Sequence, residues 1–266
     1  MPRPIYDGDM RVLAAALLLT GGGGGLFAAE LKPVTVADFD RYIEKTRQRL
    51  QHQTPFLWAE QSAARRSRVR GGQVVVEPAG AKPIIEVTDG LIHDWVGAVF
   101  VPGVTLSSTL GHVEDYDHAR THHRDVLDSH IISHHDNEFV VFMRLLKKKM
   151  ITVVLDTEHD IHYYPIDATH CRSESRTIKI AEVANPGKKD EHELPPGTGY
   201  GFLWKLDTFW RFEESDGGTW IECEAISLTR DIPTGLGWLI EPIIRNLPRE
   251  SLENTLRETA AALKSK

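Results

Sequence analysis

The clearest pattern in the chain is an alternation of large apolar residues with polar ones before a tight turn. The apolar residues occupy even-numbered positions: Phe202, Trp204, Leu206, Trp210 and Phe212. This period of two is typical of a half-buried β-strand. A Ser-Asp-Gly-Gly turn at 215–218 and a second apolar run at 220–228 follow. Because Asp-Gly between two such runs favours a two-residue loop, the pattern predicts a β-hairpin.

The two-residue loop also predicts the register of the hairpin. On one face it pairs Phe212 with Ile221, Trp210 with Cys223, Thr208 with Ala225 and Leu206 with Ser227. Large residues then mostly oppose smaller ones, which leaves two interpretations open, a solid interdigitated core or a ligand cavity. On the other face Arg211 opposes Glu222, a charge pair worth roughly 0.2 to 1 kcal/mol.

A long amphipathic helix is predicted at the end of the chain. Its apolar positions recur at helical spacing: Leu252, Leu256, Thr259 and Leu263. Charged residues fall mostly on the other side, so we expect the apolar face to be buried. Pro242 and Pro248 divide the stretch after residue 235 into a short and a longer helical piece, with Pro248 in the first turn of the longer one.

The middle of the chain predicts an antiparallel meander, because β-branched and aromatic runs alternate there with turn-forming residues. A strand is expected after Ile84 and a helical segment near 105–125. Four further strands are expected at 138–146, 150–155, 162–166 and 177–183. The long polar loop at 186–196 is interpreted as a candidate pocket mouth.

Residues 30–83 predict a helical arm and a linker. Thr35 and Asp38 are candidate caps for the helix. One face of that helix carries Phe39, Tyr42, Ile43, Thr46 and Leu50. Glycine and proline pairs mark loops around a short strand at 74–76. We expect the arm to pack on the rest of the chain.

Residues 1–29 have the pattern of an export signal. Arg11 precedes an apolar run at 12–19, and small residues end at Ala29, as in the charged, apolar and small-residue regions of a signal peptide. The apolar run is too short to serve comfortably as a permanent membrane span. A cytoplasmic protein with a disordered leader is the alternative, and Met1 and Met10 are both candidate start sites.

Several stretches resemble the START-like superfamily, also called SRPBCC, which includes polyketide cyclases and lipid-transfer domains. They are Leu203-Trp204, Trp210-Arg211-Phe212, Ile-Ser-Leu-Thr-Arg-Asp-Ile-Pro at 226–233 and Leu-Pro-Arg-Glu-Ser-Leu at 247–252. The resemblance covers residues 84–265 and is closest to bacterial members of unassigned function. It implies an α+β helix-grip fold, in which a curved antiparallel sheet wraps around a long C-terminal helix. The expected domains are a signal peptide at 1–29, the arm and linker at 30–83 and a START-like domain at 84–266.

Length and charge limit the partners. A domain of about 180 residues buries enough surface for a core and a pocket. The net charge of −7 and the isoelectric point near 6.0 argue against nucleic acid as a partner. One basic cluster occurs at Arg65, Arg66, Arg68 and Arg70. We interpret this cluster as a solvated helix end or linker.

Histidine is the most suggestive chemical signal. Seven of the thirteen histidines fall between His112 and His135, and His118 and His122 have the i, i+4 spacing of two ligands on one helix face. A zinc site is therefore one interpretation. The chain lacks a His-Glu-x-x-His motif and paired cysteines. We therefore favour a polar, solvated stretch and expect no bound metal.

Other catalytic signatures are absent from the sequence. It contains no Gly-x-Ser-x-Gly elbow, no phosphate-binding Gly-x-x-x-x-Gly-Lys and no dinucleotide-binding turn. We therefore assign no cofactor and no catalytic residue. Cys171 and Cys223 are expected to stay unbridged, because the strand at 202–212 is predicted to lie between their strands.

Two functional classes follow from these observations. The favoured one is an exported protein, periplasmic or secreted, that binds or carries a lipid or other hydrophobic small molecule between the sheet and the C-terminal helix. The candidate ligand-binding residues are Phe142, Arg144, Tyr163, Trp204, Trp210, Arg211, Trp238, Leu252 and Leu256. The alternative is a cyclase- or hydrolase-like enzyme in which a pocket histidine, tyrosine or carboxylate transfers a proton. A purely structural or interaction domain is a third interpretation.

Overall fold

The computed structural model describes residues 29–148, 152–232 and 237–265. The expected signal peptide lies outside the described residues, apart from Ala29 at its end. The helices are α1 (Pro33–Gln51), α2 (Ala63–Arg70), α3 (Leu106–Val113) and α4 (Gly237–Lys264), with the 3₁₀ helices η1 (Trp58–Gln61) and η2 (Tyr116–Thr121). The strands are β1 (Val75–Pro78), β2 (Ile84–Val87), β3 (Gly90–Pro102), β4 (Val126–His135), β5 (Glu138–Lys148), β6 (Thr152–Pro165), β7 (His170–Ala184), β8 (His192–Glu193), β9 (Lys205–Ser215) and β10 (Gly218–Arg230).

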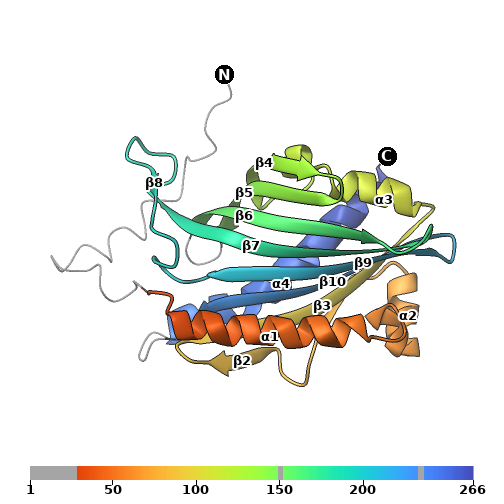
Figure 1. Ribbon diagram of the computed structural model, residues 1–266, viewed down its shortest axis with the longest axis horizontal. Helices are drawn as coiled ribbons and strands as arrows, with labels where there is room; N and C mark the ends of the chain where they lie inside the picture. The colour runs from red at the N-terminus through yellow and green to blue at the C-terminus, as the bar shows by residue number, and fades with distance from the viewer. Residues whose placement is uncertain (1–28, 149–151, 233–236, 266) are drawn as a thin grey trace.

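One antiparallel sheet organises the fold. Its strand order is β1-β3-β10-β9-β7-β6-β5-β4, with β2 beside β3 and β8 beside β7. α4 lies across one face of the sheet, which we call the inner face, and contacts β3 and β10 (Figure 1). α1 packs on the opposite, outer face. The predicted α+β helix-grip fold is confirmed.

The β9–β10 hairpin has the predicted register. Phe212 pairs with Ile221, Trp210 with Cys223, Thr208 with Ala225, Leu206 with Ser227 and Arg211 with Glu222. The loop consists of Asp216 and Gly217, whose φ angles of 55° and 74° are those of a type I′ turn. The strand begins at Lys205, so Trp204 lies just outside the alternating segment.

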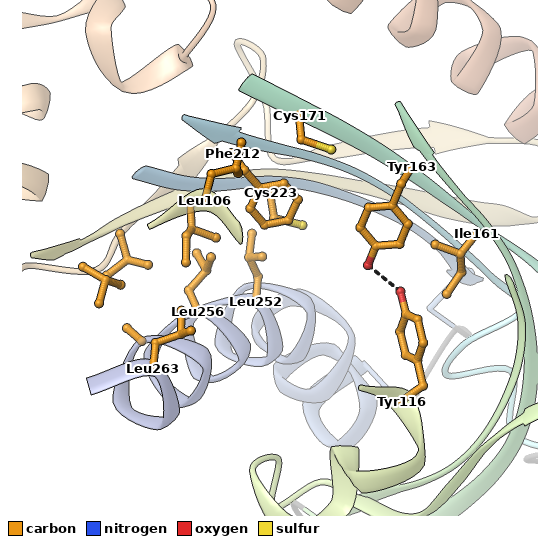
Figure 2. Close-up of a cluster of buried hydrophobic side chains, with 14 of the residues drawn as sticks. Leu106, Tyr116, Ile161, Tyr163, Cys171, Phe212, Cys223, Leu252, Leu256 and Leu263 are labelled. Carbon is orange, nitrogen blue, oxygen red and sulfur yellow. Dashed lines mark hydrogen bonds between the residues drawn. The ribbon is translucent and has the colours of Figure 1, made fainter. Parts of the chain in front are cut away.

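The apolar face of α4 is buried on the inner face of the sheet. Leu252, Leu256 and Leu263 share one buried cluster with Phe212 and Ile221 (Figure 2). This confirms the predicted helix face. The predicted division into two helical pieces at Pro242 and Pro248 is wrong, since α4 is continuous from Gly237 to Lys264. Pro248 has no backbone N–H and therefore makes no hydrogen bond to the preceding turn of the helix. Buried side chains before and after Pro248 nevertheless hold the helix on the sheet.

Three strand predictions need correction. The two strands expected at 150–155 and 162–166 are one long strand, β6. Its middle looked like a turn because Asp156, Glu158 and Asp160 alternate onto the outer face. β4, which the sequence presented as a polar histidine-rich stretch, is a half-exposed edge strand paired with β5. The short strand expected at 74–76 is confirmed as β1, which pairs with β3 in the same sheet.

The N-terminal arm covers the outer face. Phe39 and Ile43 of α1 share a buried cluster with Ile92, Ile226 and Leu228. α1 begins at Pro33, two residues before the expected cap, because proline suits the first helical position. Thr35 is therefore inside the helix, and its hydroxyl donates to the carbonyl oxygen of Thr88 at 2.7 Å.

The basic cluster on α2 is not simply solvated. The guanidinium of Arg65 lies 3.6 Å from the centre of the Trp58 ring, and that of Arg70 lies 4.3 Å from the centre of the Phe100 ring. Arg66 pairs with Asp216 in the hairpin turn at 2.6 Å. These stacked and paired arginines join α2 to η1 and to the sheet.

The strand order supports the expectation that the two cysteines stay unbridged. Cys171 on β7 and Cys223 on β10 are buried and free, and β9 lies between their strands. Two strand spacings are roughly 9 to 10 Å, beyond the usual reach of a disulfide. Thiol titration of the denatured, unreduced protein should find two free thiols. A linked Cys171-Cys223 peptide would show that this strand order is wrong.

Candidate functional site

A cavity of about 320 Å³ lies between the inner face of the sheet and α4. Its walls come from β5, β6, β7, β9 and β10, from α4, and from η2 with its flanking residues. Figure 2 shows the strands curving around α4 on this side. The structure therefore favours the cavity interpretation of the hairpin over a solid core.

Most of the wall is apolar. The sheet contributes Met143, Leu145, Val153, Leu155, Ile161, Leu206, Trp210 and Phe212. α4 contributes Ile244, Leu247 and Leu252, and the segment before β9 contributes Phe202 and Leu203. Such a wall suits an apolar ligand, because most of the side chains that bound the space offer no hydrogen bonds.

The space exists because small residues meet on adjacent strands. Ser175 on β7 pairs with Thr208 on β9, which pairs with Ala225 on β10. Ser173 and Ser227 also line this floor of the cavity. A floor of Val, Ile or Phe at these positions would fill the volume below α4. Small side chains in register on β7, β9 and β10 thus leave open volume between the sheet and α4.

The interior polar groups of the cavity are neutral. Thr157 donates its hydroxyl proton to the carbonyl oxygen of Met143 at 2.9 Å, so Nε2 of His159 carries a proton and donates to the Thr157 oxygen at 2.9 Å. Burial lowers the pKa of His159 to about 4. Tyr116 and Tyr163 form a hydroxyl pair at 2.7 Å, as Figure 2 shows.

Charged groups gather at the partly exposed rim of the cavity. Lys147 on β5 donates to Asp125 at 2.8 Å and to Ser251 of α4 at 3.2 Å. Glu258 of α4 accepts from Arg124 at 2.7 Å. These bonds connect the β4–β5 end of the sheet to α4. The rim therefore carries paired charges, and the floor carries hydroxyl groups.

Three of the nine predicted ligand-binding residues line the cavity. They are Tyr163, Trp210 and Leu252. Leu256 is fully buried beside them but packs on the sheet beyond the cavity wall. The side chain of Trp238 lies outside the described residues.

The other four predicted residues do not line the cavity. Strand alternation places Phe142, Arg144 and Arg211 on the outer face, and Trp204 precedes β9. Phe142 faces the outer side of β5, where it stacks on His130. Arg144 also faces outward and binds Asp156 at 2.7 Å. Arg211 donates to the carbonyl oxygen of Leu50 in α1 at 2.6 Å. Trp204 packs in the outer cluster under α1.

Sequence reasoning missed most of the polar interior. Tyr116, His159 and the serines of β7 line the cavity, yet none belongs to a motif. The usable signal was the odd-numbered alternation through β6, which continues from Val153 to Tyr163. The loop at 186–196, interpreted as a pocket mouth, is not part of the cavity wall.

The histidine-rich stretch does not place His118 and His122 on one face of an α-helix, as their i, i+4 spacing suggested. His118 lies in the 3₁₀ helix η2, and His122 follows that helix. The two residues therefore do not have the α-helical geometry that the zinc interpretation requires. His122 instead contacts His112, with ring centres 4.7 Å apart. In the described part of the chain, no group of three or more His, Cys, Asp or Glu is arranged to hold a metal ion. Across the same residues, no helix has the length and apolar character to cross a membrane.

No protein-family model matches the sequence, and no curated protein matches it. Among solved structures, the STAR-related lipid transfer protein from Xanthomonas axonopodis is similar, with 14% identity, a TM-score of 0.46 and coverage of 68% of this chain and 97% of that chain. A START superfamily protein from Mycobacterium smegmatis has 11% identity and a TM-score of 0.44, covering 65% and 98%. Human STARD10 has 9% identity and a TM-score of 0.43, covering 76% and 80%. The arrangement of the sheet and α4 in this chain is a helix-grip fold.

Proposed function

We propose that this protein binds or carries a lipid or another hydrophobic small molecule in the cavity between the sheet and α4. The observation that carries the proposal is the apolar cavity of about 320 Å³, a volume within the usual range for small-molecule sites of about 300–1,000 Å³. Most of its wall comes from strands and from α4, so the site is largely preformed on rigid elements.

The distribution of charge supports an apolar ligand. Lys147 and Glu258 at the rim are each paired with a group of opposite charge. In the interior, the imidazole of His159 is neutral at pH 7 because burial holds its pKa near 4, and an imidazole with so low a pKa is a weak general base. This setting favours binding over proton transfer by His159.

A cavity-filling variant tests the proposal. Wild-type protein should bind the neutral fluorophore N-phenyl-naphthylamine with one site per chain, measured by fluorescence titration. Ala225→Phe should weaken binding by about tenfold or more, equivalent to about 1.4 kcal/mol, because the added ring occupies the floor opposite Thr208. Val34→Phe, a matched addition at an exposed position of α1, should leave the affinity unchanged. Equal affinities for wild type and Ala225→Phe would contradict binding in this cavity.

We also propose that the protein acts outside the cytoplasm, as a periplasmic or secreted protein. The support is the charged, apolar and small-residue pattern that ends at Ala29. N-terminal sequencing of protein recovered from its native host should then find a mature chain that begins near Ala29 or Glu30. A soluble cytoplasmic protein that retains residues 1–20 would reject export.

A further inference from the structure

Two tyrosines meet inside the cavity with their hydroxyl groups 2.7 Å apart. Tyr116 begins η2 and Tyr163 lies near the end of β6, so the pair joins two sides of the cavity (Figure 2). Both side chains are more than nine-tenths buried, with exposures of 8% and 6%. Their neighbours are apolar, since Phe139 packs against both rings.

The pair leaves one hydrogen-bond donor unused. Two phenols carry two hydroxyl protons, and the bond between them uses one. Within the described residues, neither hydroxyl makes a second hydrogen bond. A buried donor without an acceptor is unfavourable, so this O–H is suited to a ligand atom that only accepts.

The surroundings select a neutral acceptor. Two cations near the cavity in the described part of the chain, Lys147 and Arg124, are paired with carboxylates at the rim. Burial raises the pKa of both tyrosines, and the negative charge of Glu114 raises it further, so the local field also opposes an anionic ligand group. A buried carboxylate without a cation is costly. A carbonyl oxygen has no such penalty.

The floor of the cavity also carries an uncharged hydrogen-bonding group, on β10. Ser227 lines the cavity, is 5% exposed, and its hydroxyl has no hydrogen-bond partner in the described part of the chain. The interior thus offers uncharged hydrogen-bonding groups on two sides of an apolar space.

We infer that the ligand is an apolar molecule with a neutral carbonyl group, whose oxygen accepts a hydrogen bond from the Tyr116–Tyr163 pair. This inference rests on the proposed function and names the chemical class of its ligand. The expected ligand classes are ketones, quinones and esters, whereas fatty acids and plain hydrocarbons are not expected to bind in this way. The carbonyl is oriented toward η2 and β6, and the apolar body lies along Trp210 and the floor.

Two matched probes test the inference. One is a dimethylamino-naphthalene that bears a propionyl group, and the other bears a propyl group in its place. The full-length wild-type protein should bind the ketone about fivefold more tightly, the value of one net hydrogen bond. The double variant Tyr116→Phe/Tyr163→Phe should lose this preference, so that its affinities for the two probes become equal. The emission of the bound ketone should also move to shorter wavelength, because its hydrogen bond is lost.

The double variant removes both partners of the pair, so it avoids the unpaired hydroxyl that a single variant would create. Tyr164→Phe is the matched control, because Tyr164 is adjacent in β6 but 41% exposed on the other face. If the double variant does not fold, the infrared band of the ketone bound to wild type decides. A carbonyl stretch below its value in hexane supports the inference, and an unshifted stretch overturns it.

The outcomes separate this inference from the proposed function. Equal binding of both probes to wild type, or a preference that survives the double variant, would overturn the carbonyl assignment and leave apolar binding intact. Failure of wild type to bind either probe would overturn both.

Discussion

Deleting residues 248–266 is expected to abolish stable folding. The deletion removes Leu252, Leu256, Ala260 and Leu263, which are at most 5% exposed. Burying one leucine side chain contributes about 1.5–3 kcal/mol, and the net stability of a domain is about 5–15 kcal/mol. The loss of this face also exposes the inner cluster of the sheet. Circular dichroism during heating should show no cooperative transition for the truncated chain.

A single substitution at Leu256 also tests the contact between α4 and the sheet, with a smaller expected loss of stability. Leu256 is completely buried, and a methyl group placed on Gly97 of β3 would lie 2.7 Å from its Cδ1 atom. Helix and sheet are therefore in close contact at this point. Leu256→Ala should lower the free energy of unfolding by about 2–5 kcal/mol. Arg257→Ala, the next residue, is exposed and should cost less than about 1 kcal/mol. A truncated chain that still unfolds cooperatively at the wild-type temperature would contradict the role given to α4.

The sequence was sufficient to predict the elements that depend on local patterns, namely turn length, strand alternation and helical spacing. The β9–β10 register follows from a two-residue loop and strict alternation, both readable from residues 202–228. The buried face of α4 follows from helical spacing alone. β6 was harder to predict, because its outward-facing residues Asp156, Glu158 and Asp160 gave the middle of a long strand the composition of a turn.

The site was harder to predict because both faces of the sheet are buried. Alternation shows that Arg211 and Trp210 face opposite ways, but it does not show which face holds the cavity. α1 covers the outer face, so Arg211 is only 6% exposed there. Trp204 was misplaced for another reason: it precedes β9, and its ring packs with the residues under α1. The pairing of Tyr116 with Tyr163 depends on tertiary contacts between residues that are 47 positions apart.

The same covered outer face contains buried carboxyl groups that no sequence motif marks. Asp94 on β3 and Glu222 and Glu224 on β10 are 2%, 4% and 4% exposed. Tyr42 of α1 donates to Asp94 at 2.8 Å, and Arg49 of α1 pairs with Glu224. Burial raises the pKa of Glu222 to about 7, and burial together with the charge of Asp94 raises that of Glu224 to about 8.

These raised pKa values give stability a definite pH dependence. Between the unfolded pKa near 4.5 and the folded pKa, the native state keeps a proton that the unfolded state has lost, so stability falls as pH rises. His93 and His159 act in the opposite direction below pH 6.5, because burial lowers their folded pKa to about 4. The two effects oppose each other at acidic pH. Above pH 6.5 the carboxyl groups dominate.

We therefore expect the free energy of unfolding to fall by about 2–3 kcal/mol between pH 6.5 and pH 8. Urea denaturation at a series of pH values measures this fall. Glu224→Gln should remove most of the slope, because an amide keeps the shape of the protonated acid and does not titrate. Glu86→Gln, at an exposed position of β2, should leave the slope as in wild type. If stability instead rises across this interval, Glu224 is ionised in the folded protein, and its pairing with Arg49 outweighs the cost of burial.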